Sequence, residues 1–279
     1  MHTTRPFDLL AFDLDGTTVT WPKKVMPQVT AEAFSRAHDR GVVVVAATGR
    51  PLSMLHILAD ARWLDYCITL NGALVRRHDD QSVLFGRQFT PQQVQTVLEA
   101  TSDLDASWFV FRGDNSYMAR DCHTYLANRQ NGGAEEIARR FPGTVIVDSV
   151  PDALRKLGYV DVYKMQCSLG DAAVREVAHR RLAAIGEFEI ADMVDTEAEI
   201  TLAGANKGNA LAELAHRLGI DPARTVAFGD DGNDLSMAGK AGTFVAVANA
   251  KPEVLAAADE VCPSVEENGV ATWIEAHLG

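Results

Sequence analysis

The stretch Phe7–Thr20, FDLLAFDLDGTTVT, is the part of the sequence that decides the fold. It begins as a continuous apolar run and then changes to two aspartates, Asp13 and Asp15, followed at once by Gly16. A continuous apolar run of this length is typical of a strand that is buried on both faces of a parallel sheet. The chain therefore places two carboxylates at the point where a buried strand is expected to end.

Further apolar runs of the same kind recur along the chain, at Val42–Ala47, Tyr66–Leu70, Thr225–Phe228 and Thr243–Val247. Helical patterns lie between them, at Gln28–Arg40, Pro51–Ala61 and Gly208–Leu218. We expect the first of these helices to stop at Gly41, because glycine is common directly after a helix. Strands and helices that alternate at this spacing predict a doubly wound α/β fold with a mostly parallel sheet.

The middle of the chain has a different character. Between about Leu84 and Ile200, short strand patterns are mixed with helical ones, at Pro91–Thr101, Trp108–Phe111, Tyr159–Ser168 and Asp171–Ile185. We interpret this region as a second, α+β domain that is inserted into the first. The expected boundaries are residues 1–83 and 200–279 for the α/β core and residues 84–199 for the insertion.

Charge and composition exclude several classes of partner. The 279 residues include 26 Lys and Arg against 38 Asp and Glu, which gives a formal net charge of −12. No Lys/Arg-rich block interrupts this acidic balance, so a nucleic-acid partner has no electrostatic footprint here, and attraction to anionic membranes is disfavoured. An anionic substrate would need a metal ion or a few local cations to overcome the overall field.

The cysteines and the N-terminus indicate the expected location. The chain contains four cysteines, which are dispersed and form no CxxC pair, a pattern that favours reduced thiols in a cytosolic protein. The first residues, MHTTRPFDLL, lack the pattern of a signal peptide. No apolar run approaches the ~20 residues that cross a bilayer. We therefore expect a cytoplasmic protein without a membrane partner. Nothing in the sequence specifies an oligomeric state.

A short polar cluster follows almost every core strand. Asp13 and Asp15 follow the first, and the remaining clusters are Thr48-Gly49-Arg50, Asn71-Gly72 and the run Asp230, Asp231, Asn233 and Asp234. Ligands of open parallel α/β sheets bind beyond the carboxyl ends of the strands. The four clusters are therefore expected to converge on one site.

The residue types in these clusters favour a divalent cation and a phosphate. Gathered aspartates repel one another unless a cation relieves the repulsion, and carboxylate oxygens are ligands that Mg²⁺ prefers. Thr48 offers a hydroxyl, Gly49 lets the backbone approach closely, and Arg50 precedes an expected helix N-terminus, which attracts anions. Lys207 stands at the start of another helix, where a cation opposes the helix dipole, so a role in binding an anion is favoured.

This chemistry explains the paired aspartates at the end of the first strand. Asp13 is suited to attack phosphorus as a nucleophile, because a carboxylate is ionised at neutral pH without a base to activate it. Asp15 can protonate the leaving alcohol and then take a proton from the hydrolytic water. Gly16 permits the turn and Thr17 can anchor the loop. Mg²⁺ and Lys207 would neutralise the charge on the transferring phosphoryl group.

Four motifs resemble those of haloacid dehalogenase (HAD) superfamily phosphatases, in the same order: DLDGT (Asp13–Thr17), ATGR (Ala47–Arg50), Lys207-Gly208 and GDDGND (Gly229–Asp234). The segments TLNGA (Thr69–Ala73) and NAKPEVLAAADEV (Asn249–Val261) are similar to those of the Cof-like, type IIB subgroup. The resemblance covers both core segments, and it implies that the inserted middle is a cap domain.

The resemblance also implies roles for individual residues. Asp13 would be nucleophile and metal ligand, and Asp15 would be acid/base and would bind the metal through its backbone carbonyl. Thr48 and Lys207 would hold the phosphoryl group. The last motif would supply the metal ligand Asp230, the phosphate ligand Asn233 and Asp234, which would support the water shell of the metal.

Some alternatives stay open from the sequence. Asn233 and Asp234 could simply cap the following helix, and Arg50 could serve either phosphate binding or an ion pair. The favoured function is Mg²⁺-dependent hydrolysis of a small phosphate monoester, such as a sugar phosphate or a related metabolite. The alternatives are a sugar phosphomutase of the same superfamily and a receiver-like switch that is phosphorylated on aspartate but does not turn over.

Overall fold

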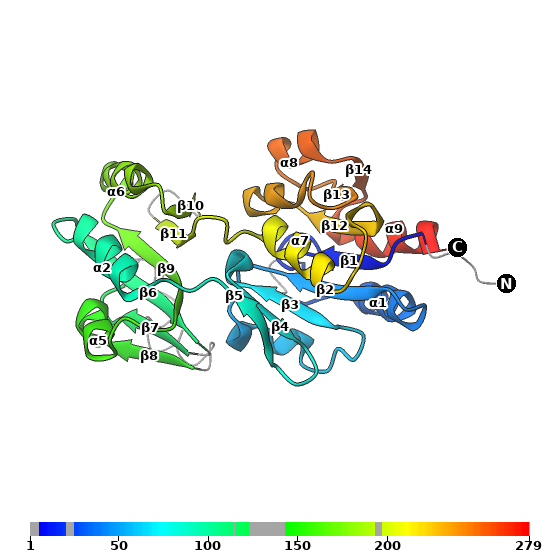
Figure 1. Ribbon diagram of the computed structural model, residues 1–279. Helices are drawn as coiled ribbons and strands as arrows, with labels where there is room; N and C mark the ends of the chain where they lie inside the picture. The colour runs from blue at the N-terminus through cyan, green and yellow to red at the C-terminus, as the bar shows by residue number, and fades with distance from the viewer. Residues whose placement is uncertain (1–5, 21–24, 114, 123–142, 193–196, 279) are drawn as a thin grey trace. The chain divides into compact units, whose positions relative to one another are not determined.

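The computed structural model describes residues 6–20, 25–113, 115–122, 143–192 and 197–278 (Figure 1). The chain divides into two compact units. We call the first the core unit, which consists of Met1–Arg50, Leu55–Gly86 and Asn206–Gly279. We call the second the inserted unit, which consists of Pro51–Met54 and Arg87–Ala205. From the sequence we expected the insertion at residues 84–199.

The core unit is built on one mostly parallel sheet with the strand order β14-β13-β12-β1-β2-β3-β4-β5. Neighbouring strands from β14 to β3 run parallel, and β4 and β5 add two antiparallel pairs at one edge. The strands are β1 (Leu9–Phe12), β2 (Val43–Ala47), β3 (Tyr66–Thr69), β4 (Leu74–Arg77), β5 (Val83–Gly86), β12 (Thr225–Gly229), β13 (Thr243–Val247) and β14 (Glu260–Cys262). The predicted α/β fold with a mostly parallel sheet is confirmed.

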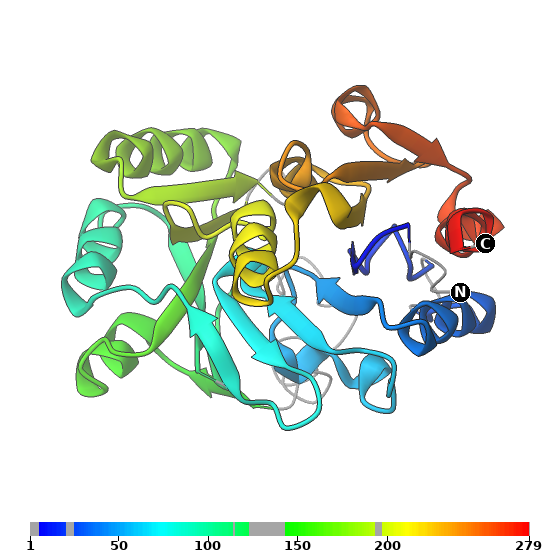
Figure 2. The same cartoon turned by 45° about the vertical axis from the view of Figure 1, so that its right-hand side comes forward.

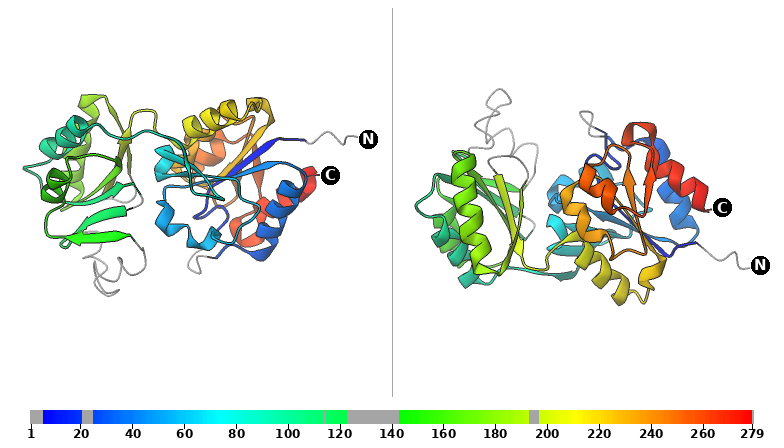
Figure 3. Two further views of the ribbon diagram at one scale, coloured as in Figure 1. Left: turned by 60° about the horizontal axis from the view of Figure 1, so that its bottom comes forward. Right: turned by 90° about the horizontal axis from the view of Figure 1, so that it is seen from above.

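The central strands form because their side chains are buried on both faces. Every residue of β1 and of β12 is buried, as expected where helices cover both sides of a parallel sheet. The helices are α1 (Gln28–Asp39), α7 (Lys207–Arg217), α8 (Pro252–Ala257) and α9 (Gly269–Leu278). Helices α1 and α9 pack together on one face, and α7 lies over β3 on the other (Figures 2 and 3). None of the helices in the described ranges is long and apolar enough to span a membrane.

One predicted helix is wrong. The segment that we expected to be a helix from Pro51 to Ala61 forms two separate 3-10 turns, Leu52–Met54 and His56–Leu58. The backbone bonds there join residues three apart, from Met54 N to Pro51 O and from Leu58 N to Leu55 O. Only Leu55, Leu58 and Ala61 of this segment are buried. The segment therefore has too narrow an apolar stripe for packing to stabilise a longer helix. Helix α1, in contrast, ends as expected before Gly41, which has a φ of 82°.

The inserted unit is an α+β unit with its own sheet, in the order β10-β11-β9-β6-β7-β8. All neighbours are antiparallel except β7 and β8. Its strands are β6 (Ala106–Arg112), β7 (Asn115–Ala119), β8 (Thr144–Val147), β9 (Val162–Leu169), β10 (Phe188–Asp192) and β11 (Glu197–Leu202). Its helices α2 (Pro91–Ala100), α5 (Val150–Lys156) and α6 (Ala172–Ile185) stack along one face of this sheet (Figure 1). Their apolar residues form a core with one face of the sheet.

Candidate active site

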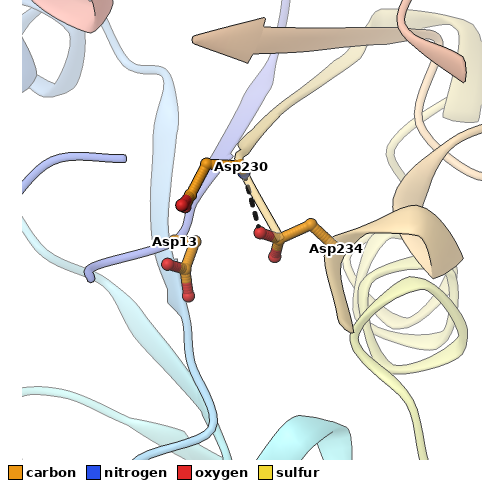
Figure 4. Close-up of side chains that lie close together, drawn as sticks. All are labelled: Asp13, Asp230 and Asp234. Carbon is orange, nitrogen blue, oxygen red and sulfur yellow. Dashed lines mark hydrogen bonds between the residues drawn. The ribbon is translucent and has the colours of Figure 1, made fainter. Parts of the chain in front are cut away.

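Three aspartates from two neighbouring strand ends meet at the carboxyl edge of the core sheet. Asp13 follows β1, and Asp230 follows β12, which pairs in parallel with β1. Asp234 lies four residues later in the 3-10 turn Gly232–Met237. One carboxylate oxygen of each aspartate lies within 4.8 Å of the others (Figure 4). The first and last motifs therefore meet in the structure, as the sequence predicts.

Lys207 joins this cluster from the start of α7. Its ammonium is fully buried and donates hydrogen bonds to Asp13 Oδ1 at 2.6 Å and to Asp234 Oδ1 at 2.7 Å. The position follows from the start of α7, where Asn206 caps the helix by accepting a bond from the backbone N–H of Asn209. Burial disfavours the charged lysine, but the carboxylates of Asp13 and Asp234 raise its pKa above the ordinary value. Lys207 is therefore a permanent cation in the site.

A glycine lets α7 approach closely enough for this contact. A Cβ atom on Gly208 would lie 1.6 Å from the backbone oxygen of Ser236. The hydroxyl of Ser236 accepts a hydrogen bond from the N–H of Gly208 at 3.1 Å. The two residues of the lysine-glycine motif therefore have separate roles. Lys207 brings a cation to the site, and Gly208, which has no side chain, lets α7 pack close to the backbone of Ser236.

The three carboxylates outnumber Lys207, the cation that contacts them among the residues that the structure describes. Burial, together with the charges of Asp234 and Asp230, raises the pKa of Asp13 well above its usual range, although Lys207 opposes the change. Burial also raises the pKa of Asp230 from 3.8 to about 6. Such shifts indicate a site in which an additional cation is needed to keep all acids ionised. A donor set of clustered carboxylate oxygens suits a hard divalent cation.

Asp234 also organises the loop around itself. It is fully buried, and its Oδ2 accepts hydrogen bonds from the backbone N–H groups of Asp230 at 2.9 Å and Asp231 at 3.1 Å. Its Oδ1 accepts the bond from Lys207. The dashed line in Figure 4 marks the bond to Asp230. The alternative that this residue acts only as a helix cap is therefore too narrow, because the same carboxylate fixes both Asp230 and Lys207.

The loop after β1 is tied to Asp230. Thr17 donates a hydrogen bond from Oγ1 to Asp230 Oδ1 at 2.6 Å, and Thr18 donates to the backbone oxygen of Asp13 at 2.6 Å. Gly16 has a φ of 87°, and a Cβ at that position would lie 2.3 Å from Asp230 Oδ2. Only glycine therefore fits here, for reasons of both backbone and space.

Asp15 and Arg50 form an ion pair. The guanidinium of Arg50 donates from Nε to Asp15 Oδ2 at 2.7 Å and from Nη2 to Asp15 Oδ1. The Asp15 side chain is about half exposed, and its carboxylate is not part of the three-aspartate cluster found among the described residues. Of the two interpretations of Arg50 that the sequence left open, the ion pair is present.

Thr48, Gly49 and Asn233 lie together beside these loops. Thr48 is buried, and its Oγ1 accepts a hydrogen bond from the N–H of Arg50 at 3.2 Å. A Cβ on Gly49 would lie 3.8 Å from Nδ2 of Asn233. That amide donates to Oδ1 of Asn71 at 3.1 Å. The structure therefore brings the expected phosphate-binding residues of the second and fourth motifs together, and it adds Asn71.

Two further asparagines were not among the site residues expected from the sequence. Asn71 was expected to lie at this edge, as part of the polar cluster after Tyr66–Leu70 and of a family-like segment, but no role was predicted for it. Asn249 donates from Nδ2 to the backbone oxygen of Gly16 at 2.8 Å and accepts from the N–H of Val265 at 2.9 Å. Its only sequence signal was its place in the Cof-like segment. Lys251, in the same segment, forms an ion pair of 2.5 Å with Asp231.

Comparison with known proteins identifies the class. A family described as haloacid dehalogenase-like hydrolase matches residues 10–274. The chain is 29% identical over 272 residues to a protein of Bacillus subtilis (strain 168) named "Putative phosphatase YxeH", and the match covers 95% of this chain and 96% of that protein. The chain therefore belongs to the haloacid dehalogenase-like hydrolases. The resemblance to the Cof-like, type IIB subgroup is confirmed with it.

Solved structures agree with this assignment. The chain superimposes on the HAD subclass IIB sugar phosphatase BT4131 with a TM-score of 0.80 and 25% identity, over 96% of this chain and 98% of that one. A haloacid dehalogenase-like hydrolase from B. subtilis gives a TM-score of 0.83 at 22% identity, over 96% and 99% of the two chains. The second similarity is one of fold.

Proposed function

We propose that the protein hydrolyses a small phosphate monoester, such as a sugar phosphate or a related metabolite, through an aspartyl-phosphate formed on Asp13. The observation that carries the proposal is the buried contact of Lys207 with Asp13 and Asp234, next to Asp230. A permanent cation beside a carboxylate nucleophile suits a reaction in which negative charge develops on a phosphoryl group. Two similar proteins, YxeH and BT4131, are named as a putative phosphatase and a sugar phosphatase, which supports the proposal.

The reaction has two steps in this proposal. In the first, a carboxylate oxygen of Asp13 bonds to phosphorus, and the bond from phosphorus to the ester oxygen breaks. Asp15 enters this step protonated and donates that proton to the departing alcohol, and so becomes the carboxylate that Arg50 pairs with. In the second, a water oxygen bonds to phosphorus as Asp15 takes its proton, and the bond to Asp13 breaks to release phosphate.

The surrounding residues position and neutralise the phosphoryl group. Lys207 supplies fixed positive charge, and Thr48, Gly49 and Asn233 form the expected phosphate-binding edge. For Arg50 the proposal uses the ion pair, one of the two roles that the sequence left open, since the contact with Asp15 suits Arg50 to orient the acid/base residue.

Mg²⁺ is the proposed cofactor. Asp13 and Asp230 would hold it, with the backbone carbonyl of Asp15 as a ligand and Asp234 supporting its water shell, as the family pattern implies. The ion would supply positive charge to the phosphoryl oxygens and to the crowded acids. The fit rests on the oxygen-only donor set and on the raised pKa of Asp13 and Asp230.

The inserted unit is proposed to act as a cap that selects the substrate. Substitutions confined to residues 87–205 should then change the relative kcat/KM values across a panel of phosphate esters. Their effect on p-nitrophenyl phosphate, which offers little for a cap to recognise, should be small.

The function is tested by a panel of phosphate monoesters assayed with Mg²⁺, read as phosphate release and kcat/KM. We expect turnover that EDTA abolishes and Mg²⁺ restores. Asp13→Asn should remove turnover while the circular dichroism spectrum and Tm stay those of a folded protein. Turnover by Asp13→Asn would place the nucleophile elsewhere. Rearrangement of a sugar phosphate that depends on a bisphosphate activator would identify a mutase, and a phosphoaspartate that persists for minutes would identify a switch.

A further inference from the structure

The turn after β3 contains three consecutive residues with left-handed backbone. Their φ angles are 53° at Leu70, 57° at Asn71 and 97° at Gly72. This region is costly for residues with a side chain, and a leucine side chain has no polar atom that could form a local hydrogen bond to offset the cost. Such strain persists only where the surroundings hold it, and it gathers at ligand sites. Here the N–H groups of Leu70 and Asn71 donate to the backbone oxygens of Arg50 and Thr48, both at 3.1 Å.

The strained turn also meets the start of α7. A Cβ on Gly72 would lie 2.2 Å from the backbone oxygen of Asn206 and 2.9 Å from the backbone nitrogen of Lys207. The turn therefore links the loop after β2 to the helix that carries the buried lysine. A regular loop would join β3 to β4 at lower conformational cost but would not make this connection.

The left-handed conformation of the turn places the Asn71 side chain beside Gly49 and Asn233, two residues that are expected to bind phosphate. Asn71 is 7% exposed, and its Oδ1 accepts the hydrogen bond from Asn233 Nδ2 at 3.1 Å. The same oxygen would lie 2.8 Å from a Cβ on Gly49. The Asn71 side chain therefore lies beside both Gly49 and Asn233.

We infer that Asn71 is a positioning residue, which fixes the amide of Asn233 so that its nitrogen faces an anion bound beside Thr48 and Gly49. The oxygen and nitrogen ends of an amide have nearly the same shape, and only the nitrogen end attracts phosphate. In the structure the Oδ1 end of Asn71 faces Asn233, and because that oxygen can only accept a hydrogen bond it pairs with the nitrogen end of Asn233. This inference rests on the proposed function, because it assigns a role at the same phosphoryl site.

A glycine substitution isolates the side chain from the backbone strain. Asn71→Gly removes the acceptor but tolerates a φ of 57°, so the turn itself should persist. The matched control is Asn268→Gly, because Asn268 has a φ of 58° at the end of a 3-10 turn outside the site. Both variants should keep the thermal unfolding midpoint close to that of the parent protein.

The test is a double-mutant cycle on the dissociation constant of inorganic phosphate, measured by calorimetry on the Mg²⁺-loaded full chain. We expect Asn71→Gly and Asn233→Ala each to weaken binding by about threefold to tenfold, the range of one neutral hydrogen bond. The double variant should bind no more weakly than Asn233→Ala alone. Asn268→Gly should bind as the parent does, and the Mg²⁺ concentration at half-saturation should be unchanged in all of them.

Several outcomes would overturn the inference. These are unchanged phosphate binding in Asn71→Gly, independent effects that multiply in the double variant, or no phosphate binding by the parent protein. Phosphate binding needs no turnover, so the cycle can succeed or fail separately from the hydrolysis assay. A parent protein that hydrolyses esters but shows multiplying effects would keep its proposed function and lose this role for Asn71.

Discussion

Thr17 donates a 2.6 Å hydrogen bond to the carboxylate of Asp230, across 213 residues of chain. The two residues meet because β1 and β12 are parallel neighbours, with Leu9 opposite Thr225. The bond opposes the rise that burial causes in the pKa of Asp230. Thr17, in the first motif, therefore stabilises the charged form of Asp230, the expected metal ligand in the last motif.

Replacing Thr17 by valine tests this relationship. The shape is nearly preserved, but the donor is lost, so the pKa of Asp230 should rise further and Mg²⁺ should bind more weakly. A hydrogen bond to a charged group contributes about 1.5–3 kcal/mol, so a proton competes more strongly with Mg²⁺ for Asp230, and we expect the Mg²⁺ concentration at half-maximal activity at pH 7 to rise by about threefold to tenfold. Thr17→Ser restores the donor and should recover most of the affinity. Equal Mg²⁺ affinity in Thr17→Val and the parent protein would contradict the role.

The pH dependence of metal binding follows from the same carboxylate. The pKa of Asp230 lies near 6 in the metal-free fold and 3.8 is its ordinary value. Below about pH 6 a cation must displace a proton to bind, so the apparent Mg²⁺ affinity should fall as the pH is lowered from 7 to 5. Calorimetric titrations at several pH values, in buffers with different ionisation enthalpies, would measure the proton release. An affinity that is constant over this range would contradict the raised pKa.

The stability of the metal-free protein should change in the opposite sense. An acid whose pKa is higher in the folded state binds more protons there, so its contribution to stability falls as the pH rises from about 4 to about 6. The change from 3.8 to about 6 corresponds to at most about 3 kcal/mol. In EDTA above pH 7, Asp230→Asn should therefore unfold at a temperature no lower than the parent does. Mg²⁺ should raise the Tm of the parent only.

The sequence predicts the parts of this site that are set by strand ends and misses the parts that are set by packing. Asp13 and Asp230 could be placed together because carboxyl ends of parallel strands share one edge of a sheet. Lys207 could be singled out because a cation is costly at a helix start. The strand-end argument also places Asn71 at this edge, but neither argument predicts its contact with Asn233, which depends on a left-handed turn and spans 162 residues.

The role of Arg50 shows the same limit. Its residue type and position fit phosphate binding and an ion pair equally well, and only the packing of two loops decides that it meets Asp15. The prediction of a helix over Pro51–Ala61 was wrong for a related reason. Proline at the first position is a good local signal, but the segment buries too few side chains to hold a helix together.

Lys207 should be required for both stability and turnover. Lys207→Met leaves the buried carboxylates of Asp13 and Asp234 without their cation, a change that costs about 3–5 kcal/mol in comparable buried pairs. Urea unfolding in EDTA would measure the loss, and Mg²⁺ should recover part of it. The matched control is Lys251→Met, because the pair of Lys251 with Asp231 is half exposed and should contribute less than about 1 kcal/mol. Similar losses in the two variants would contradict the assignment.

The role of Asp15 can be tested by comparing phosphate esters whose leaving groups differ in their need for a proton. If it protonates the departing oxygen, Asp15→Asn should reduce kcat/KM on alkyl phosphates by about 10²–10⁴-fold. The loss on p-nitrophenyl phosphate should be smaller, because p-nitrophenolate leaves without a proton. Equal losses on both kinds of ester would argue against a proton donor at this position.

Arg50 can then be assigned by comparison with that pattern. If Arg50 aims Asp15, Arg50→Met should reproduce the stronger loss on alkyl phosphates, mainly in kcat. If it instead binds the phosphoryl group, KM should rise by the same factor for both kinds of ester and kcat should change little. Arg50→Lys keeps the charge but loses the two-pronged contact with Asp15, so under the first role it should behave like Arg50→Met. Because the bidentate pair is the contact that the structure contains, we expect the leaving-group-dependent pattern in both Arg50 variants.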